Sequence, residues 1–156
     1  MYRTVLWATD GSMGADLALD EARRVLEPDG RLIAFHCDER FAGSRVNGAP
    51  VAADEPERKA KIHAEVDALR AEGVDVTLVV DVTHHGVAGE IASAAEEHDA
   101  DVIVCGTRGL GSVAGVFSGS VAMRLPHLAG CPVLVVSERA ANRANARGVA
   151  HAGTRT

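Results

Sequence analysis

The stretch GTRGLGSVAGVFSGS, residues 106–120, decides how the rest of the chain is interpreted. It follows the apolar run DVIVC (101–105) and leads into VAMRL (121–125), so it joins an expected buried strand to an expected helix. Five of its fifteen residues are Gly, four are Ser or Thr, and the only charge is on Arg108. A flexible, hydroxyl-rich segment directly after a buried strand is either a solvent loop or a place where a ligand meets the backbone.

Working outward, five short runs rich in Val, Leu and Ile have the length of strands: residues 3–9, 31–37, 75–80, 101–105 and 132–136. Their apolar content is nearly continuous rather than alternating, which is typical of strands buried on both faces of a parallel sheet. Residues 38–55 form a long polar connection, and connections of this length tend to be functional or mobile.

Between these runs, apolar residues recur at helical spacing in four groups: Ala18, Ala22, Val25 and Leu26; Ile62, Val66 and Leu69; Val87, Ile91, Ala94 and Ala95; Phe117, Val121, Leu125 and Leu128. The motif PDG (28–30) is expected to end the first helix, Gly73 to follow the second, and Pro126 to kink the fourth. Strands and helices therefore alternate. This order predicts an α/β fold with helices on both faces of the sheet and right-handed crossovers.

The totals of 156 residues, 47% hydrophobic and 24% charged, favour one globular domain. No apolar run approaches the ~20 residues of a membrane span, and the start MYRTVLWATDGS lacks a signal-peptide pattern, so we expect a cytoplasmic protein with no membrane partner. Cys37, Cys105 and Cys131 lie far apart without paired spacing, so we interpret them as free, largely buried thiols rather than zinc ligands.

Charge is distributed unevenly along the chain. The chain has a net charge of −6. Residues 139–156 contain four Arg and no acidic residue, so the rest of the chain has a net charge of −10. An acidic body argues against a nucleic-acid partner. Because residues 139–156 also lack apolar periodicity, we predict a folded domain over residues 1–138 followed by a disordered basic tail.

The segment 106–120 has the chemistry of a phosphate site. Glycines let backbone N–H groups approach an anion, and Ser118, Gly119 and Ser120 lie at the start of the expected fourth helix, where N–H donors are free. Arg108 supplies a positive charge. The motif Gly109–Ala114 matches G-x-G-x-x-A, but it follows the fourth strand and no acidic residue stands about 20 positions later, so we reject a dinucleotide site. A P-loop is excluded because no Lys occurs after Lys61.

The spacing Gly106-x2-Gly109-x9-Gly119-Ser120, followed by CPVLVV, resembles the ATP-binding class of universal stress proteins. The start VLWATDGS is similar to the family's first strand with its Asp, and FHCDE is similar to the end of its second strand. The resemblance covers residues 2–137. It implies a five-stranded parallel sheet of order 3-2-1-4-5, a Rossmann-like fold of the adenine nucleotide alpha hydrolase type.

The resemblance also implies a set of ligand contacts. Ala8, Thr9 and Asp10 would line the nucleoside end of ATP, and the backbone of Cys37 would read the adenine edge. Gly106 and Gly109 would cradle ribose and phosphates, and Gly119 and Ser120 would hold the outer phosphates, with Mg²⁺ as a companion of the nucleotide. Arg108 and Ser118 are added on charge and placement. Two residues depart from the family pattern: Cys37 stands where Val is usual, and Pro126 lies within the last helix.

Some residues have a simpler interpretation. Asp10 is a possible helix cap, although Ser12 is the better candidate. We expect His36 to be packed or hydrogen-bonded in its strand, His84 and His85 to lie in a solvated turn, and the glutamates of the helix faces to be solvated: Glu57, Glu65, Glu72, Glu96 and Glu97.

Three functions remain open at this point. The first is a nucleotide-binding regulatory module of the stress response that acts as a homodimer, paired through the apolar edge strand 132–136. The second is a slow ATPase or nucleotidyl-transferring enzyme, for which Asp10 is the one obvious carboxylate. The third is a dimerisation scaffold with no ligand. We expect at most weak hydrolysis, and we assign no catalytic residue.

Overall fold

The computed structural model describes residues 1–38, 45–46, 49–50, 55–82, 86–107, 120–137 and 139. Five strands form one parallel sheet: β1 (Tyr2–Ala8), β2 (Leu26–Asp38), β5 (Asp75–Val82), β6 (Val102–Gly106) and β7 (Val133–Val136). Four helices connect them: α1 (Met13–Val25), α2 (Glu55–Ala71), α3 (Val87–Glu97) and α4 (Ser120–Leu128). A short antiparallel pair, β3 (Arg45–Val46) and β4 (Ala49–Pro50), lies in the connection between β2 and α2.

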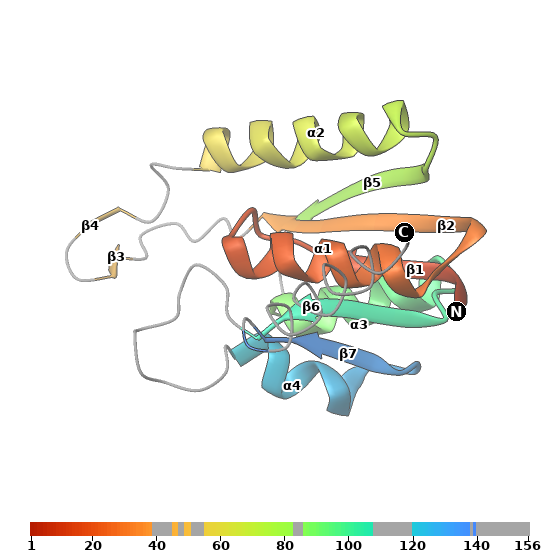
Figure 1. Ribbon diagram of the computed structural model, residues 1–156. Coiled ribbons are helices and arrows are strands. Elements are labelled where there is room, and N and C mark those ends of the chain that lie inside the picture. Colours follow the sequence, from red (N-terminus) through yellow and green to blue (C-terminus); the bar gives the residue numbers. More distant parts are fainter. Residues whose placement is uncertain are drawn as a thin grey trace.

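The strand order is β5-β2-β1-β6-β7, which is the predicted order 3-2-1-4-5 once the β3–β4 pair is set aside. β1 lies in the centre, with Ala8 opposite Phe35 of β2 and Trp7 opposite Val104 of β6. Helices lie on both sides of the sheet, and every strand points toward the edge from which α1, α2 and α4 start (Figure 1). The predicted α/β fold is confirmed.

Two apolar clusters cover the two faces of the sheet. On one face, Val5 and Trp7 of β1 pack with Ala18 of α1 and Val66 of α2. On the other, Leu6 of β1 packs with residues of α3 and α4, among them Ile91 and Leu125. Trp7 is fully buried, and its Nε1–H donates to the carbonyl oxygen of Ala15 at 2.9 Å, which ties β1 to α1.

The helix ends follow the local sequence signals. Ser12 is the N-cap of α1, and its Oγ accepts the N–H of Ala15 at 3.3 Å. Gly73 has φ of +87°, its N–H donates to Arg70, and the N–H of Val74 donates to Leu69. This pair of hydrogen bonds is a Schellman motif, so the prediction that Gly73 ends α2 is confirmed.

Some details of the sequence prediction were wrong. β2 starts at Leu26 and contains the PDG motif, because residues 27–30 form an irregularity between the pairs Tyr2–Leu26 and Thr4–Arg31. Asp38 and Glu55 belong to β2 and α2 rather than to a loop. Leu128 is 45% exposed and does not join the apolar stripe of α4. Phe117, which was assigned to the same stripe, lies outside the described residues.

Over the part of the chain that the structure describes, no helix is long and apolar enough to cross a membrane.

Candidate functional site

The carboxyl ends of β1 and β6 lie side by side at one edge of the sheet. The chain leaves β1 toward α1 on one face, whereas α4, the next described helix after β6, packs on the other face. In open α/β sheets a ligand site forms where neighbouring strands send their connections to opposite faces. Figure 1 shows α1 and α4 both starting at this edge, so the two helix N-termini flank the ends of β1 and β6.

The turn after β1 is fixed by its own hydrogen bonds. The N–H of Thr9 donates to Phe35 of β2 at 2.9 Å, and the Thr9 hydroxyl accepts the N–H of Gly11 at 3.2 Å. Asp10 is partly exposed, and its Oδ1 accepts the N–H of Ser12 at 3.0 Å. Gly11 has φ of +75°, a conformation that favours glycine. Ser12 is therefore the helix cap, and the Asp10 carboxylate orients the turn in front of it.

Gly106, at the end of β6, is packed against the first turn of α1. A Cβ atom at this position would lie 2.6 Å from the carbonyl oxygen of Gly14 and 2.8 Å from its carbonyl carbon. Any side chain there would push β6 away from α1. Glycine at position 106 is therefore required by the fold itself, and it brings the β6 end next to the β1–α1 turn.

The start of α2 adds positive charge beside this turn, which the sequence interpretation missed. Lys61 Nζ donates to the carbonyl oxygen of Gly11 at 2.9 Å and to both carboxylate oxygens of Asp16 at 2.8 Å. Arg58 lies next to Gly11, whose Cβ, if it had one, would be 3.4 Å from the Arg58 Cβ. The sequence does contain a sign of this charge, because three cations lie in the first two turns of the helix: Arg58, Lys59 and Lys61.

His36 and Asp38 of β2 face the same cluster. The His36 ring is buried, with Nδ1 3.0 Å from the carbonyl oxygen of Thr9 and Nε2 2.9 Å from Oε1 of Glu55. Asp38 is buried too and accepts a hydrogen bond from Lys59 at 2.6 Å. The prediction that His36 is a packed or hydrogen-bonded strand residue is confirmed, and its link to α2 is an addition.

Ala8 and Cys37 lie on the opposite face, in the apolar cluster with α3 and α4. All three cysteines are free; Cys37 and Cys105 are buried and Cys131 is partly buried. Burial raises the pKa of the Cys105 thiol to about 11, so this thiol stays protonated and unreactive at neutral pH. The side chain of Cys37 belongs to the core.

Ser120 is exposed and is the first residue of α4. The other predicted phosphate contacts lie outside the described residues, namely Arg108, Gly109, Ser118 and Gly119, as do His84 and His85. Among the described residues, no group of three His, Cys, Asp or Glu side chains is placed to hold a metal ion. Of the glutamates expected to be solvated, Glu65 is an exception, because it is partly buried beside Lys61 at 3.5 Å.

A parallel sheet of this order, with residues gathered where β1 and β6 end, defines a Rossmann-like α/β protein. The model of the universal stress protein family matches residues 1–137. The chain therefore belongs to the universal stress protein family.

Individual relatives agree with this assignment. The chain is 35% identical over 141 residues to the universal stress protein in the QAH/OAS sulfhydrylase 3′ region of Thermus aquaticus, covering 87% of this chain and 99% of the relative. Among solved structures, hypothetical protein MJ0577 is 26% identical with a TM-score of 0.65, covering 88% of this chain and 97% of its own. A universal stress protein solved in complex with cAMP is 27% identical with a TM-score of 0.55, and the match covers 86% of this chain and 96% of that protein.

Proposed function

We propose that the chain binds ATP at the carboxyl ends of β1 and β6 and acts as a nucleotide-dependent regulatory protein. The observation that carries this proposal is the meeting of the β1–α1 turn with the end of β6, where Gly106 packs on Gly14. The glycine-rich segment 106–120 leaves the sheet at this point and ends where α4 begins. A phosphate group bound by that segment lies near two helix N-termini, which favour anions.

The residues of the proposed site form two groups, one that contacts the nucleoside and one that contacts ribose and phosphates. Ala8, Thr9 and Asp10 lie at the end of β1 and line the nucleoside, and the backbone of Cys37 on the neighbouring strand reads the adenine edge. The remaining contacts are to ribose and phosphates, from Gly106, Arg108, Gly109, Ser118, Gly119 and Ser120. The relative in complex with cAMP supports an adenine nucleotide as the ligand class.

Isothermal titration with ATP·Mg²⁺, cAMP and NAD tests the proposal. We expect heat with ATP, a weaker response with cAMP because it lacks the outer phosphates, and none with NAD because the dinucleotide acid is missing. Arg108→Ala should weaken ATP more than adenosine, since the guanidinium acts on charge. The absence of both heat and a thermal shift with ATP would refute the proposal.

The enzymatic alternative is tested by turnover. A slow ATPase needs a positioned carboxylate near the phosphates, and Asp10 is the candidate at this edge. Its Oδ1 already accepts the N–H of Ser12, so the carboxylate serves the turn. We expect hydrolysis by the purified chain to be absent or slow. Multiple turnovers that disappear in Asp10→Ala would assign an enzyme instead.

We propose further that the protein is a homodimer joined through β7. This strand is an edge of the sheet, consists of VLVV, and leaves Val133, Leu134 and Val135 partly exposed. The opposite edge strand, β5, carries Asp75 and Asp81, charges of the kind that protect an edge from pairing. Pairing of two β7 strands around a two-fold axis is antiparallel by symmetry.

Light scattering tests this assembly. Val135→Lys should split the dimer, because two like charges then meet near the axis. Val80→Lys is the matched control, since Val80 is 45% exposed on the other edge strand, and it should leave the dimer intact. A monomer at tens of micromolar for the unmodified chain would refute pairing through β7.

A further inference from the structure

His36 is held between two hydrogen-bond acceptors. Its side chain is 3% exposed, with Nδ1 3.0 Å from the Thr9 carbonyl oxygen and Nε2 2.9 Å from Glu55 Oε1. A carbonyl oxygen and an ionised carboxylate only accept hydrogen bonds, whereas a neutral imidazole has a single N–H to donate. Both contacts are therefore hydrogen bonds only when the pair holds one extra proton, on His36 or on Glu55.

The charges around the pair decide where this proton resides. Arg58 donates to Oε2 of Glu55, and Lys59 Nζ lies 3.9 Å from its Oε1. Because Oε2 of Glu55 already accepts from Arg58, its Oε1 is the acceptor left for Nε2, and we assign the extra proton of the pair to the imidazole. Asp38 of β2 lies on the same side and accepts a hydrogen bond from Lys59 at 2.6 Å, and Lys61 is paired with Asp16 at 2.8 Å next to the turn that holds Asp10. On the β5 side, the residue paired with His36 is Val80, which does not titrate.

We propose that protonated His36 is a proton-dependent link that holds the start of α2 against the end of β1. The imidazolium joins Thr9, the last residue before the β1–α1 turn, to Glu55, the first residue of α2. A neutral ring has one N–H for two acceptors, so loss of the proton breaks either the hydrogen bond to Thr9 or the one to Glu55, and the ring no longer joins them. The first turn of α2, with Arg58 and Lys59, is thereby loosened from the edge where β1 ends.

The direction of the pH effect follows from this geometry. The link is complete at acidic pH, where the ring carries its proton, and is lost as pH rises. This inference extends beyond nucleotide binding and does not depend on it.

The ring nitrogens report the proton directly. Long-range ¹⁵N–¹H NMR of the full chain without nucleotide should show both nitrogens of His36 protonated at pH 5.5, with a titration toward a neutral tautomer as pH rises. Glu55→Gln should shift this titration to lower pH, because the amide supplies no counter-charge. A neutral His36 tautomer throughout the range in which the chain is folded would overturn the proposal.

Thermal unfolding gives an independent measurement. We expect His36→Gln to lower the melting temperature by about 2–4 °C at pH 5.5 and by clearly less at pH 8.5. His63→Gln, at an exposed position of α2, is the matched control and should not change this pH dependence. An equal loss for His36→Gln at both pH values would show that the ring only packs and would overturn the link. Both measurements use the chain without nucleotide, so they remain informative if ATP does not bind.

Discussion

The two ends of β1 carry the same residue types, an aspartate and glycines, but use them differently. At the amino end, Asp101 Oδ2 accepts the N–H groups of Arg3 at 3.0 Å and Thr4 at 2.8 Å. Gly30 packs on the same strand, and the space between Arg3 O and Leu26 is too small for a Cβ atom. These contacts lie within the chain and hold the sheet together, so an aspartate and a glycine at this end serve the fold.

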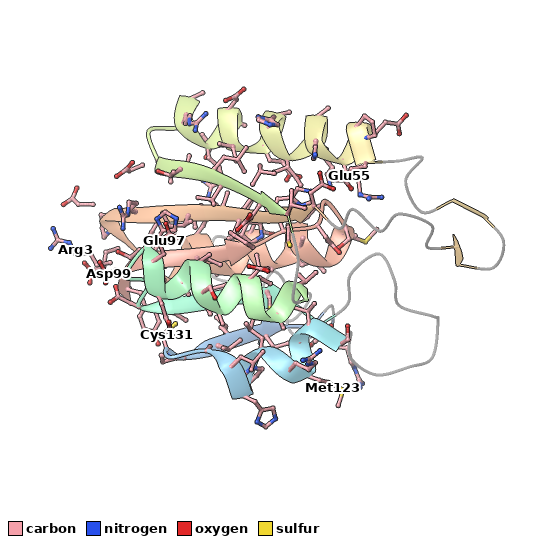
Figure 2. All side chains as sticks on the ribbon, turned by 180° about the vertical axis from the view of Figure 1, so that it is seen from behind. Arg3, Glu55, Glu97, Asp99, Met123 and Cys131 are labelled. Carbon is pink, nitrogen blue, oxygen red and sulfur yellow. The ribbon has the colours of Figure 1, made fainter. Side chains whose placement is uncertain are left out.

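At the carboxyl end the polar groups converge from several elements. Asp10 follows β1, His36 comes from β2, Gly106 from β6, and Glu55 and Lys61 from α2. Figure 2 separates the two ends: Arg3, Asp99 and Cys131 are labelled at one, Glu55 and Met123 at the other. The carboxyl end therefore differs from the amino end in gathering polar groups from several elements at the edge where ligands bind in open α/β sheets, although Gly106 and Asp10 there also serve the fold.

The largest expected effect is loss of ligand binding at the carboxyl end. Gly119→Val should abolish ATP binding and leave the melting temperature of the free protein unchanged, since a side chain there occupies the space between phosphate and backbone donors. Titration calorimetry and thermal unfolding measure the two quantities. Gly106→Ala is a useful comparison, because a Cβ 2.6 Å from Gly14 O should lower both stability and affinity. Undiminished binding by Gly119→Val would place the phosphates elsewhere.

At the amino end we expect the opposite result, a loss of stability with no loss of affinity. The Cβ of Gly30→Ala would lie 2.7 Å from Leu26 Cδ1 and 2.9 Å from Arg3 O, and such overpacking costs about 1–3 kcal/mol. Urea unfolding measures the change in the free energy of unfolding.

The control for this second prediction is Gly89→Ala in α3. Its Cβ would meet no atom within 4 Å, and alanine in a helix interior is favoured over glycine by up to about 1 kcal/mol. A gain at position 89 with a loss at position 30 would show that crowding, not the loss of glycine, causes the effect. Weaker ATP binding by Gly30→Ala would break the distinction between the two ends.

The features that could be predicted from the sequence are those that local signals determine, such as the ends of helices. Ser12 and Gly73 were identified from capping chemistry, and the sheet order came with the resemblance to the universal stress proteins. The contacts of α2 were not predictable in this way. His36 and Glu55 are 19 residues apart, and the polar connection between them has no periodicity that would place the start of the helix beside the end of β1.

The start of β2 shows the same limit. PDG is a turn signal, but the chain makes an irregular strand through it, since Leu26 already pairs with Tyr2. Tertiary pairing therefore overrides the local preference. Leu128 is the last residue of α4 and lies exposed, so the apolar spacing in the sequence extends beyond the buried side of the helix.

The smallest expected effect concerns Glu65, which lies at the carboxyl end but contributes to neither the proposed ligand site nor the His36 link. Burial, followed by the negative charge of Asp16, raises the pKa of this carboxyl group. A raised pKa means that the folded state binds the proton more tightly than the unfolded state. The free energy of unfolding therefore falls as pH rises from the ordinary value of 4.5 through the raised one.

Glu65→Gln removes this ionisation and keeps the size of the side chain. Lys61 retains both Asp16 oxygens and the Gly11 carbonyl as partners. We therefore expect a gain of about 0.5 kcal/mol at pH 7 that disappears near pH 4, where Glu65 is protonated in both states. Glu57→Gln, at an exposed position in the first turn of the same helix, should give no such gain, because its charge there favours the helix. A loss of stability at pH 7 in urea unfolding would show that the attraction between Lys61 and Glu65 outweighs the cost of burying the carboxylate.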